Sequence, residues 1–170
     1  MKAIGLLALL VIIALVEVTV APLFPISGAV PDFALVTLAV IATCNGPRAV
    51  MFAVPLMAIF LGFAADRSPA LLLLGYLPLL PIAALLEDSP LPLNAFARTL
   101  VAATATGIWC RLVLVLAAVA QSADVSVGPL LFNVLVPGLV LDVALLAVAY
   151  LPVRLLGWSG QRMTLQRGGF

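Results

Sequence analysis

The sequence contains no histidine, and only 9% of its 170 residues are charged. The missing histidine removes the commonest general base and the commonest metal ligand of proteins. The cysteines, Cys44 and Cys110, show no CxxC spacing, which favours two small apolar residues over a disulfide or a metal pair. A net charge of +1 also argues against a nucleic-acid partner and against a polybasic membrane patch.

Apolar residues fill the chain instead. Hydrophobic residues make up 65% of the sequence, and the mean hydropathy is +1.33. An average soluble domain is roughly 45–50% apolar and about 25% charged. A chain this short cannot bury so much apolar surface, because small folds keep a large share of their surface exposed. The composition therefore predicts an integral membrane protein and argues against a soluble domain, a disordered chain or a disulfide scaffold.

Six apolar runs alternate with breaks rich in Pro, Gly, Asn and Asp, as turns require. The runs are Ile4–Val20, Phe33–Cys44, Ala49–Ala65, Ala70–Leu86, Thr99–Ala120 and Leu130–Leu151. We therefore expect an all-α bundle of six transmembrane helices over residues 1–154 and a short cytoplasmic basic tail at 155–170. The second run rises only about 18 Å, against a hydrocarbon core of about 30 Å. It either lies inside the bundle or does not span fully.

The few charges predict an orientation, because Lys and Arg gather in cytoplasmic loops. With a cytoplasmic N-terminus, Arg67 would be the outside cation, beside the acidic residues Asp32, Asp66 and Asp124. The inside would hold Lys2, Arg48, Arg98, Arg154, Arg162 and Arg167. We expect both termini in the cytoplasm and the helices in contact with membrane lipid.

Four prolines lie inside the predicted helices and predict local bends: Pro55, Pro78, Pro81 and Pro137. The simpler interpretation is a change of helix shape. The alternative is a broken helix that lines a substrate cavity, for which the fourth run, with Pro78 and Pro81, is the best candidate.

Arg111 and Asp142 lie far from any predicted loop, and an intramembrane charge is a functional hypothesis by default. Arg111 lies ~15 Å below the outer end of the fifth helix, and Asp142 lies ~18 Å below that of the sixth. We predict an interhelical ion pair that fixes the register of this hairpin. A proton or substrate relay and contact with a partner helix are the alternatives.

Other polar and small residues give weaker signals. Glu17 could pair with Arg67 or extend towards water, and a cation site of Glu17, Asp32 and Asp66 is conceivable. No activated nucleophile or general base is visible, so we expect no enzyme, no cofactor and no metal. Ala103 and Gly107 form a small-xxx-small pair that permits close packing, either within the bundle or against a partner.

Several short motifs in order resemble MreD, the rod-shape-determining membrane protein family of bacteria. Pro31-Asp32 opens the second segment, and Asn45-Gly46-Pro47-Arg48 forms the turn after it. The third helix ends with Gly62 and then Asp66, Asn133 lies early in the last helix, and a basic tail follows. The resemblance covers nearly the whole chain. The Arg111–Asp142 pair is not a recognised hallmark of the family.

The resemblance implies a non-enzymatic part of the cell-elongation machinery in the bacterial inner membrane. MreD-like proteins work with MreC, with the MreB cytoskeleton and with the RodA–penicillin-binding-protein synthase of peptidoglycan. The family is also similar in fold to the six-helix substrate-binding components of energy-coupling-factor vitamin transporters. A small-molecule transporter component is therefore the alternative function.

Overall fold

The computed structural model describes residues 2–25, 29–89, 94–121 and 127–155, and it folds these into helices. The elements are α1 (Lys2–Thr19), the 3-10 helix η1 (Ala21–Leu23), α2 (Phe33–Asn45), α3 (Pro47–Ala64), α4 (Pro69–Tyr76), α5 (Leu79–Asp88), α6 (Ala95–Gln121) and α7 (Val127–Leu155). The expected all-α class is confirmed for the described residues.

Four helical stretches are long and apolar enough to cross a membrane: Ile4–Leu23, Pro47–Ala64, Pro69–Glu87 and Ala95–Ala120. The apolar stretches Phe33–Asn45 and Leu135–Leu151 are shorter. The chain therefore has the helices of a membrane protein. Two of the six expected spans fall below the length of a full span within the described residues.

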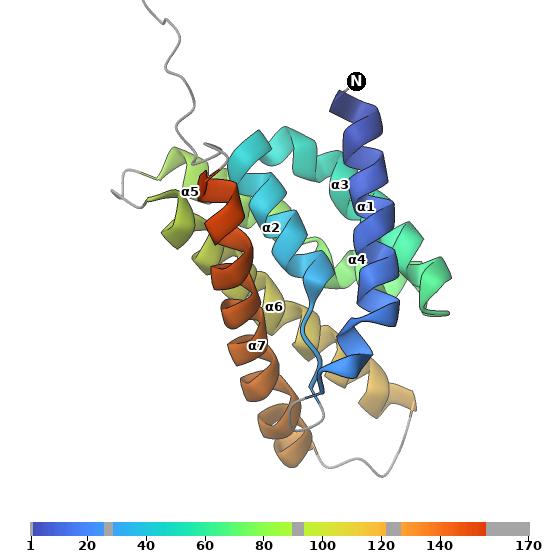
Figure 1. Cartoon of the computed structure of the whole chain (residues 1–170). Helices are drawn as coiled ribbons and strands as arrows, with labels where there is room; N and C mark the ends of the chain where they lie inside the picture. The colour runs from blue at the N-terminus through green and yellow to red at the C-terminus, as the bar shows by residue number, and fades with distance from the viewer. Residues whose placement is uncertain (1, 26–28, 90–93, 122–126, 156–170) are drawn as a thin grey trace, which may run out of the picture.

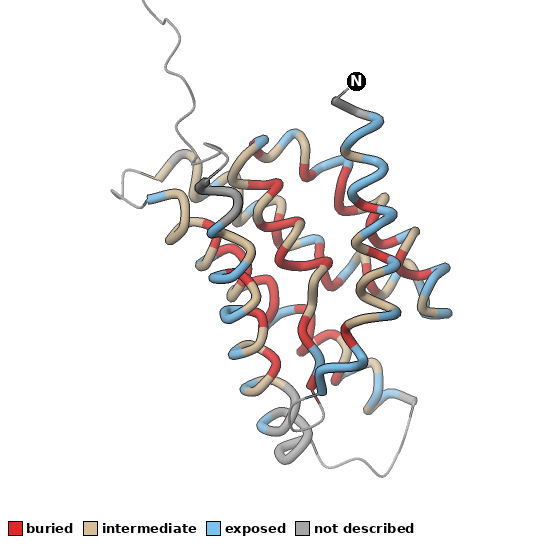
Figure 2. The backbone as a smooth tube through the Cα atoms, viewed as in Figure 1, coloured by how far each residue is buried: buried red, intermediate tan, exposed pale blue. Residues whose placement is uncertain are grey.

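The short helix α2 lies between α1, α3, α6 and α7, which all contact it (Figure 1). It begins about half-way along the neighbouring α7, and a non-helical segment leads to it from the end where α1 ends and α7 begins. We call this end, the lower end in Figure 1, the distal end. Seven of the 13 residues of α2 are buried, so the helix forms the centre of the core (Figure 2).

The outer helices turn apolar side chains away from the bundle. Exposed faces follow α1 and α7, where Ile12 is 55% exposed and Val140 is 63% exposed (Figure 2). Such faces are unstable in water and suit a lipid environment, because lipid tails are as apolar as these side chains.

Two tight turns hold α3 between its neighbours, and both contain residues of the motif noted above. Gly46 adopts a positive φ of 81° between α2 and α3, a conformation that glycine takes without strain. Between α3 and α4, Asp66 has a φ of 51°. A Cβ at Gly62 would lie 2.6 Å from Pro69 Cγ, so only glycine allows α4 to fold back this closely.

The fourth apolar run is two helices rather than the single helix we expected from the sequence. α4 ends at Tyr76 and α5 begins at Leu79, because Pro78 has no N–H to donate to Leu74 O. Trp109 on α6 supplies the missing donor: its Nε1 lies 3.0 Å from Leu74 O. The carbonyl of Leu77, which Pro81 would leave free, accepts from Leu80 N at 3.1 Å. Pro55, by contrast, lies within the continuous helix α3.

Candidate functional site: a polar network at the start of α2

The ion pair that the sequence predicted is present between α6 and α7. Arg111 Nη1 lies 2.7 Å from Asp142 Oδ2, and their side chains are 9% and 4% exposed. Two glycines make room for the guanidinium. A Cβ at Gly138 would overlap the guanidinium of Arg111, and a Cβ at Gly107 would lie 3.1 Å from Arg111 Nη1. The pair therefore depends on small residues on both helices.

Three carboxylates converge on the first turn of α2, where backbone N–H groups have no partner within the helix. Asp142 Oδ1 accepts from Asp32 N at 2.9 Å. Glu17 Oε2 accepts from Ala34 N at 3.1 Å. Asp32 itself is the N-cap, and its Oδ1 accepts from Leu35 N at 2.6 Å. Side chains from α1, from α7 and from the cap residue itself thus satisfy a helix start that lies inside the bundle.

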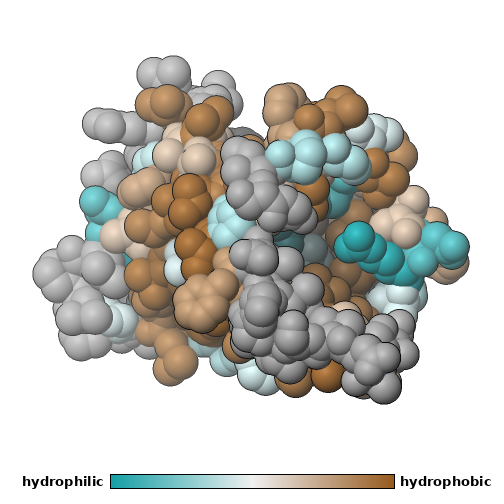
Figure 3. Space-filling view, turned by 90° about the horizontal axis from the view of Figure 1, so that it is seen from below, coloured by the Kyte–Doolittle hydropathy of each residue, from teal (hydrophilic) through white to brown (hydrophobic). Residues whose placement is uncertain are grey.

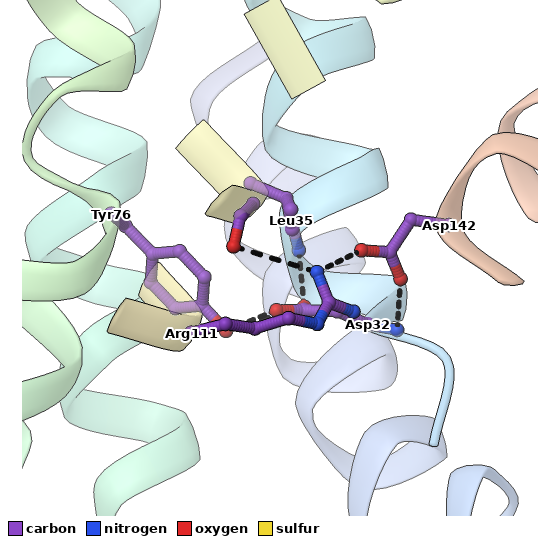
Figure 4. A network of polar contacts seen from close by, with 6 residues as sticks. Asp32, Leu35, Tyr76, Arg111 and Asp142 are labelled. Carbon is purple, nitrogen blue, oxygen red and sulfur yellow. Dashed lines mark hydrogen bonds and ion pairs between the residues drawn. The ribbon is translucent and has the colours of Figure 1, made fainter. Parts of the chain in front are cut away.

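Tyr76 connects this network to α4. Its side chain is buried, and its hydroxyl lies 3.2 Å from both carboxylate oxygens of Asp32. Figure 4 shows Tyr76, Arg111 and Asp142 reaching towards Asp32 from three different helices. Asp32 was expected in an outer loop, and this expectation is wrong. The residue is the hub of the network, because the start of α2 is drawn into the bundle.

The charges in the network do not balance. Glu17, Asp32 and Asp142 supply three carboxylates against the single guanidinium of Arg111. The positive end of the α2 dipole adds about half an elementary charge. The network therefore favours a further cation or a bound proton.

A cavity of about 340 Å³ lies beside the network and opens towards the distal end. Glu17, Asp32, Tyr76, Cys110 and Arg111 line it, together with Arg67 from the turn before α4. Its apolar lining comes from Val18, Ala21, Pro22, Ala29, Val30, Leu61, Ala65, Leu72 and Leu114. Figure 3, seen from this end, shows a hydrophilic patch beside a largely apolar rim.

The sequence suggested that Glu17 could pair with Arg67. The two residues line the same cavity, but they form no ion pair with each other. Asp66 is exposed and is not among the residues that line the cavity. Within the described part of the chain, no group of three His, Cys, Asp or Glu residues could hold a metal ion. The conceivable cation site of Glu17, Asp32 and Asp66 is therefore not formed. Cys44 and Cys110 are not joined in a disulfide.

The structure also places the remaining residues that the sequence analysis singled out. Ala103 and Gly107 are buried, and Gly107 lies against Leu35 of α2 and Leu139 of α7. Their small-xxx-small pair therefore packs within the bundle. Asn133 lies in α7, but its side chain is outside the described residues, as is the basic tail at 156–170.

Sequence reasoning missed Tyr76, Trp109 and Gly138. For Trp109 a signal existed: Pro78 frees the carbonyl of Leu74, and an indole in a membrane helix needs an acceptor. For Gly138 the signal is its position one helical turn before the buried Asp142, where a small residue leaves space for a long cation. For Tyr76 we find no signal, because its contact with Asp32 depends on where α2 begins.

Comparison with known proteins adds no relative: no family model, no curated protein and no solved structure matches the chain.

Proposed function

We propose that this chain is a non-enzymatic membrane component of the bacterial cell-elongation machinery, similar to MreD. It would lie in the inner membrane with six spans and both termini in the cytoplasm. Its direct partner would be MreC, and it would act indirectly with MreB and the RodA–penicillin-binding-protein synthase. In this way it would help regulate peptidoglycan synthesis and rod shape.

The observation that carries this proposal is the place of the motif residues. Asp32, of the Pro31-Asp32 pair, caps α2 inside the bundle and contacts Asp142 and Tyr76. Gly62 and Asp66 form the close turn between α3 and α4. The residues that support the resemblance thus define the most particular features of this fold, the short central helix and the tight turn beside it.

The shape of the chain also favours a partner within the membrane. The described residues are mostly helical, and no catalytic constellation is visible among them. A protein of this kind meets its partners largely through helix packing and through its membrane-exposed ends.

Co-purification tests the proposal. The chain is co-expressed with affinity-tagged MreC from the same organism, extracted in mild detergent, and compared with a matched pair of variants. We expect wild-type and Arg48→Gln chains to co-purify with MreC, since Arg48 is exposed at the end opposite the cavity. We expect Asp32→Ala to reduce recovery severalfold. A folded wild-type chain that does not co-purify with MreC would contradict the proposal.

The cavity favours a second candidate, a substrate-binding component of a small-molecule transporter. Its volume lies within the range of ligand sites, about 300–1,000 Å³. This candidate predicts tight binding of a vitamin-like ligand and co-purification with transporter subunits instead of MreC.

The six-span topology is tested with reporter fusions. Alkaline phosphatase fused in the turn at Arg67 or at residues 122–126 should be active, because we place both outside. Green fluorescent protein fused after residue 170 should fluoresce, because we place this end in the cytoplasm. An active phosphatase at the C-terminus would contradict the even number of spans.

A further inference from the structure

Two side chains of opposite charge type, an acidic and a basic one, line the cavity without an ion-pair partner in the described part of the chain. Glu17 lines one wall, and its Oε2 accepts the backbone N–H of Ala34. Arg67 lines the cavity from the α3–α4 turn, and the contact that the structure gives it is from its backbone N–H to Gly62 O. Among the described residues the ion pair that forms is Arg111–Asp142, so neither Glu17 nor Arg67 has an ion-pair partner there.

The inner end of the cavity is unsuited to an anion. The N–H groups of Asp32, Ala34 and Leu35, which could bind one at the start of a helix, already donate to carboxylates. Arg111 is paired with Asp142. The two carboxylates that line the cavity, Glu17 and Asp32, attract a positive group instead. A ligand would therefore place a cation near Glu17 and an anion towards Arg67, which is exposed at the mouth.

We infer that the cavity binds a zwitterion that carries a primary ammonium and an acidic group. The ammonium donates hydrogen bonds to Glu17, and the acidic group pairs with the guanidinium of Arg67. Arginine suits phosphate and carboxylate because its planar group can donate two parallel hydrogen bonds. The apolar walls at Val18, Leu61 and Leu114 accommodate the short carbon chain between the two charges.

This chemistry has two sources at the membrane surface. One is the phosphoethanolamine headgroup of a phospholipid, whose acyl chains would stay in the bilayer. The other is a free zwitterion such as an amino acid. The inference is independent of the proposed role in cell elongation, because the ligand is bound by this chain without MreC.

Binding is measured on the purified, delipidated full-length chain in detergent, by native mass spectrometry and by thermal shift. The probes are dioleoyl-phosphatidylethanolamine, dioleoyl-phosphatidylglycerol, O-phosphoethanolamine and alanine. We expect the ethanolamine lipid to bind at least about tenfold more tightly than the glycerol lipid, which lacks an ammonium. Binding of O-phosphoethanolamine or alanine without that lipid preference would support the same site with a free zwitterion as its ligand.

Two variants test the residues. Glu17→Gln removes the charge but keeps a side-chain oxygen for Ala34 N, so the start of α2 stays capped. Arg67→Gln removes the exposed cation. Each should weaken binding roughly tenfold, whereas Arg48→Gln, a matched exposed arginine at the other end, should leave it unchanged. The inference is overturned if the ethanolamine lipid binds no better than phosphatidylglycerol and neither O-phosphoethanolamine nor alanine binds, or if both cavity variants bind like Arg48→Gln.

Discussion

The start of α2 and the break between α4 and α5 pose the same problem in opposite forms. Both leave backbone polar groups without a partner in their own helix, at α2 inside the bundle and at the break on its exposed apolar surface. In hydrocarbon an unpaired group costs several kcal/mol, on the order of 4–8. At α2 the unpaired groups are N–H donors, and Glu17, Asp32 and Asp142 accept from them. At the break the unpaired group is the carbonyl of Leu74, and the indole of Trp109 donates to it.

The two solutions differ in the electric charge that they leave behind. An indole is neutral, so the break between α4 and α5 needs nothing further. Carboxylates are charged, so the start of α2 requires Arg111 and still has more negative than positive groups. We conclude that the buried start of α2 gathers charged side chains, whereas the free carbonyl at the break is satisfied by a neutral one. Four substitutions test this contrast.

The largest effect is expected at Arg111, because its removal leaves the three carboxylates without their cation. Arg111→Leu should lower the free energy of unfolding by about 3–5 kcal/mol, as for other broken buried ion pairs. Adding Asp142→Asn should recover at least half of the loss, since the amide oxygen can still accept from Asp32 N. Unfolding in mixed micelles measures both, and the absence of any recovery would show that charge is not what Arg111 supplies.

Asp32→Ala should come next, with a loss of about 2–3 kcal/mol from the missing cap and the unpaired hydroxyl of Tyr76. Asn94→Ala is the matched control, because Asn94 caps α6 at an exposed position by accepting from Ala97 N at 2.7 Å. Asn94→Ala should lower the free energy of unfolding by about 1 kcal/mol or less. Equal losses in the same micelle assay would mean that burial of the cap at α2 has no energetic consequence.

Gly138→Ala should cost about 1–3 kcal/mol, because the added methyl group occupies the space of the Arg111 guanidinium and forces it away from Asp142. Gly5→Ala is the control: a Cβ there meets nothing within 4 Å, so the helix should be unchanged or slightly more stable. Thermal unfolding in detergent compares the two variants. If Gly138→Ala is as stable as Gly5→Ala, the guanidinium has another position available.

Trp109→Phe should have the smallest effect, about 1–2 kcal/mol, for one unpaired carbonyl. A second variant, in which Pro78 is also replaced, tests this explanation directly. Pro78→Ala restores the N–H that Leu74 O lacks, so Trp109→Phe should cost almost nothing when combined with it. A double-mutant cycle measures this coupling, and an unchanged cost in the Pro78→Ala background would show that the indole does not serve the break.

The sequence was sufficient for features that follow from distance along a helix. Arg111 and Asp142 could be paired because their depths, counted from the two ends of one hairpin, nearly agree, and their separation of 2.7 Å fits this expectation. The weakness of the second run was visible as well, since its length is a simple count. For the helix that contains Pro78, the sequence favoured a change of shape, and a broken helix was the alternative interpretation.

The rest depended on packing that no periodicity encodes. Asp32 follows a proline in what reads as a loop, and its burial results from the depth at which α2 begins. Tyr76 reaches it only because α4 ends where it does, and Glu17 accepts from Ala34 rather than pairing with Arg67. These contacts join α1, α2 and α4, so their geometry arises only when the bundle is assembled.

The shortness of α2 has a consequence for membrane voltage. Its 13 residues extend about 20 Å, and the cavity reaches the start of this helix from the distal end. Where a polar cavity enters a bilayer, the electric field concentrates across the insulating material that remains. Most of the transmembrane potential would then fall along α2 itself, and a charge that enters the cavity as far as Glu17 would cross little of it. At about 2.3 kcal/mol per charge for each 100 mV, a cation would then reach this site almost without regard to voltage.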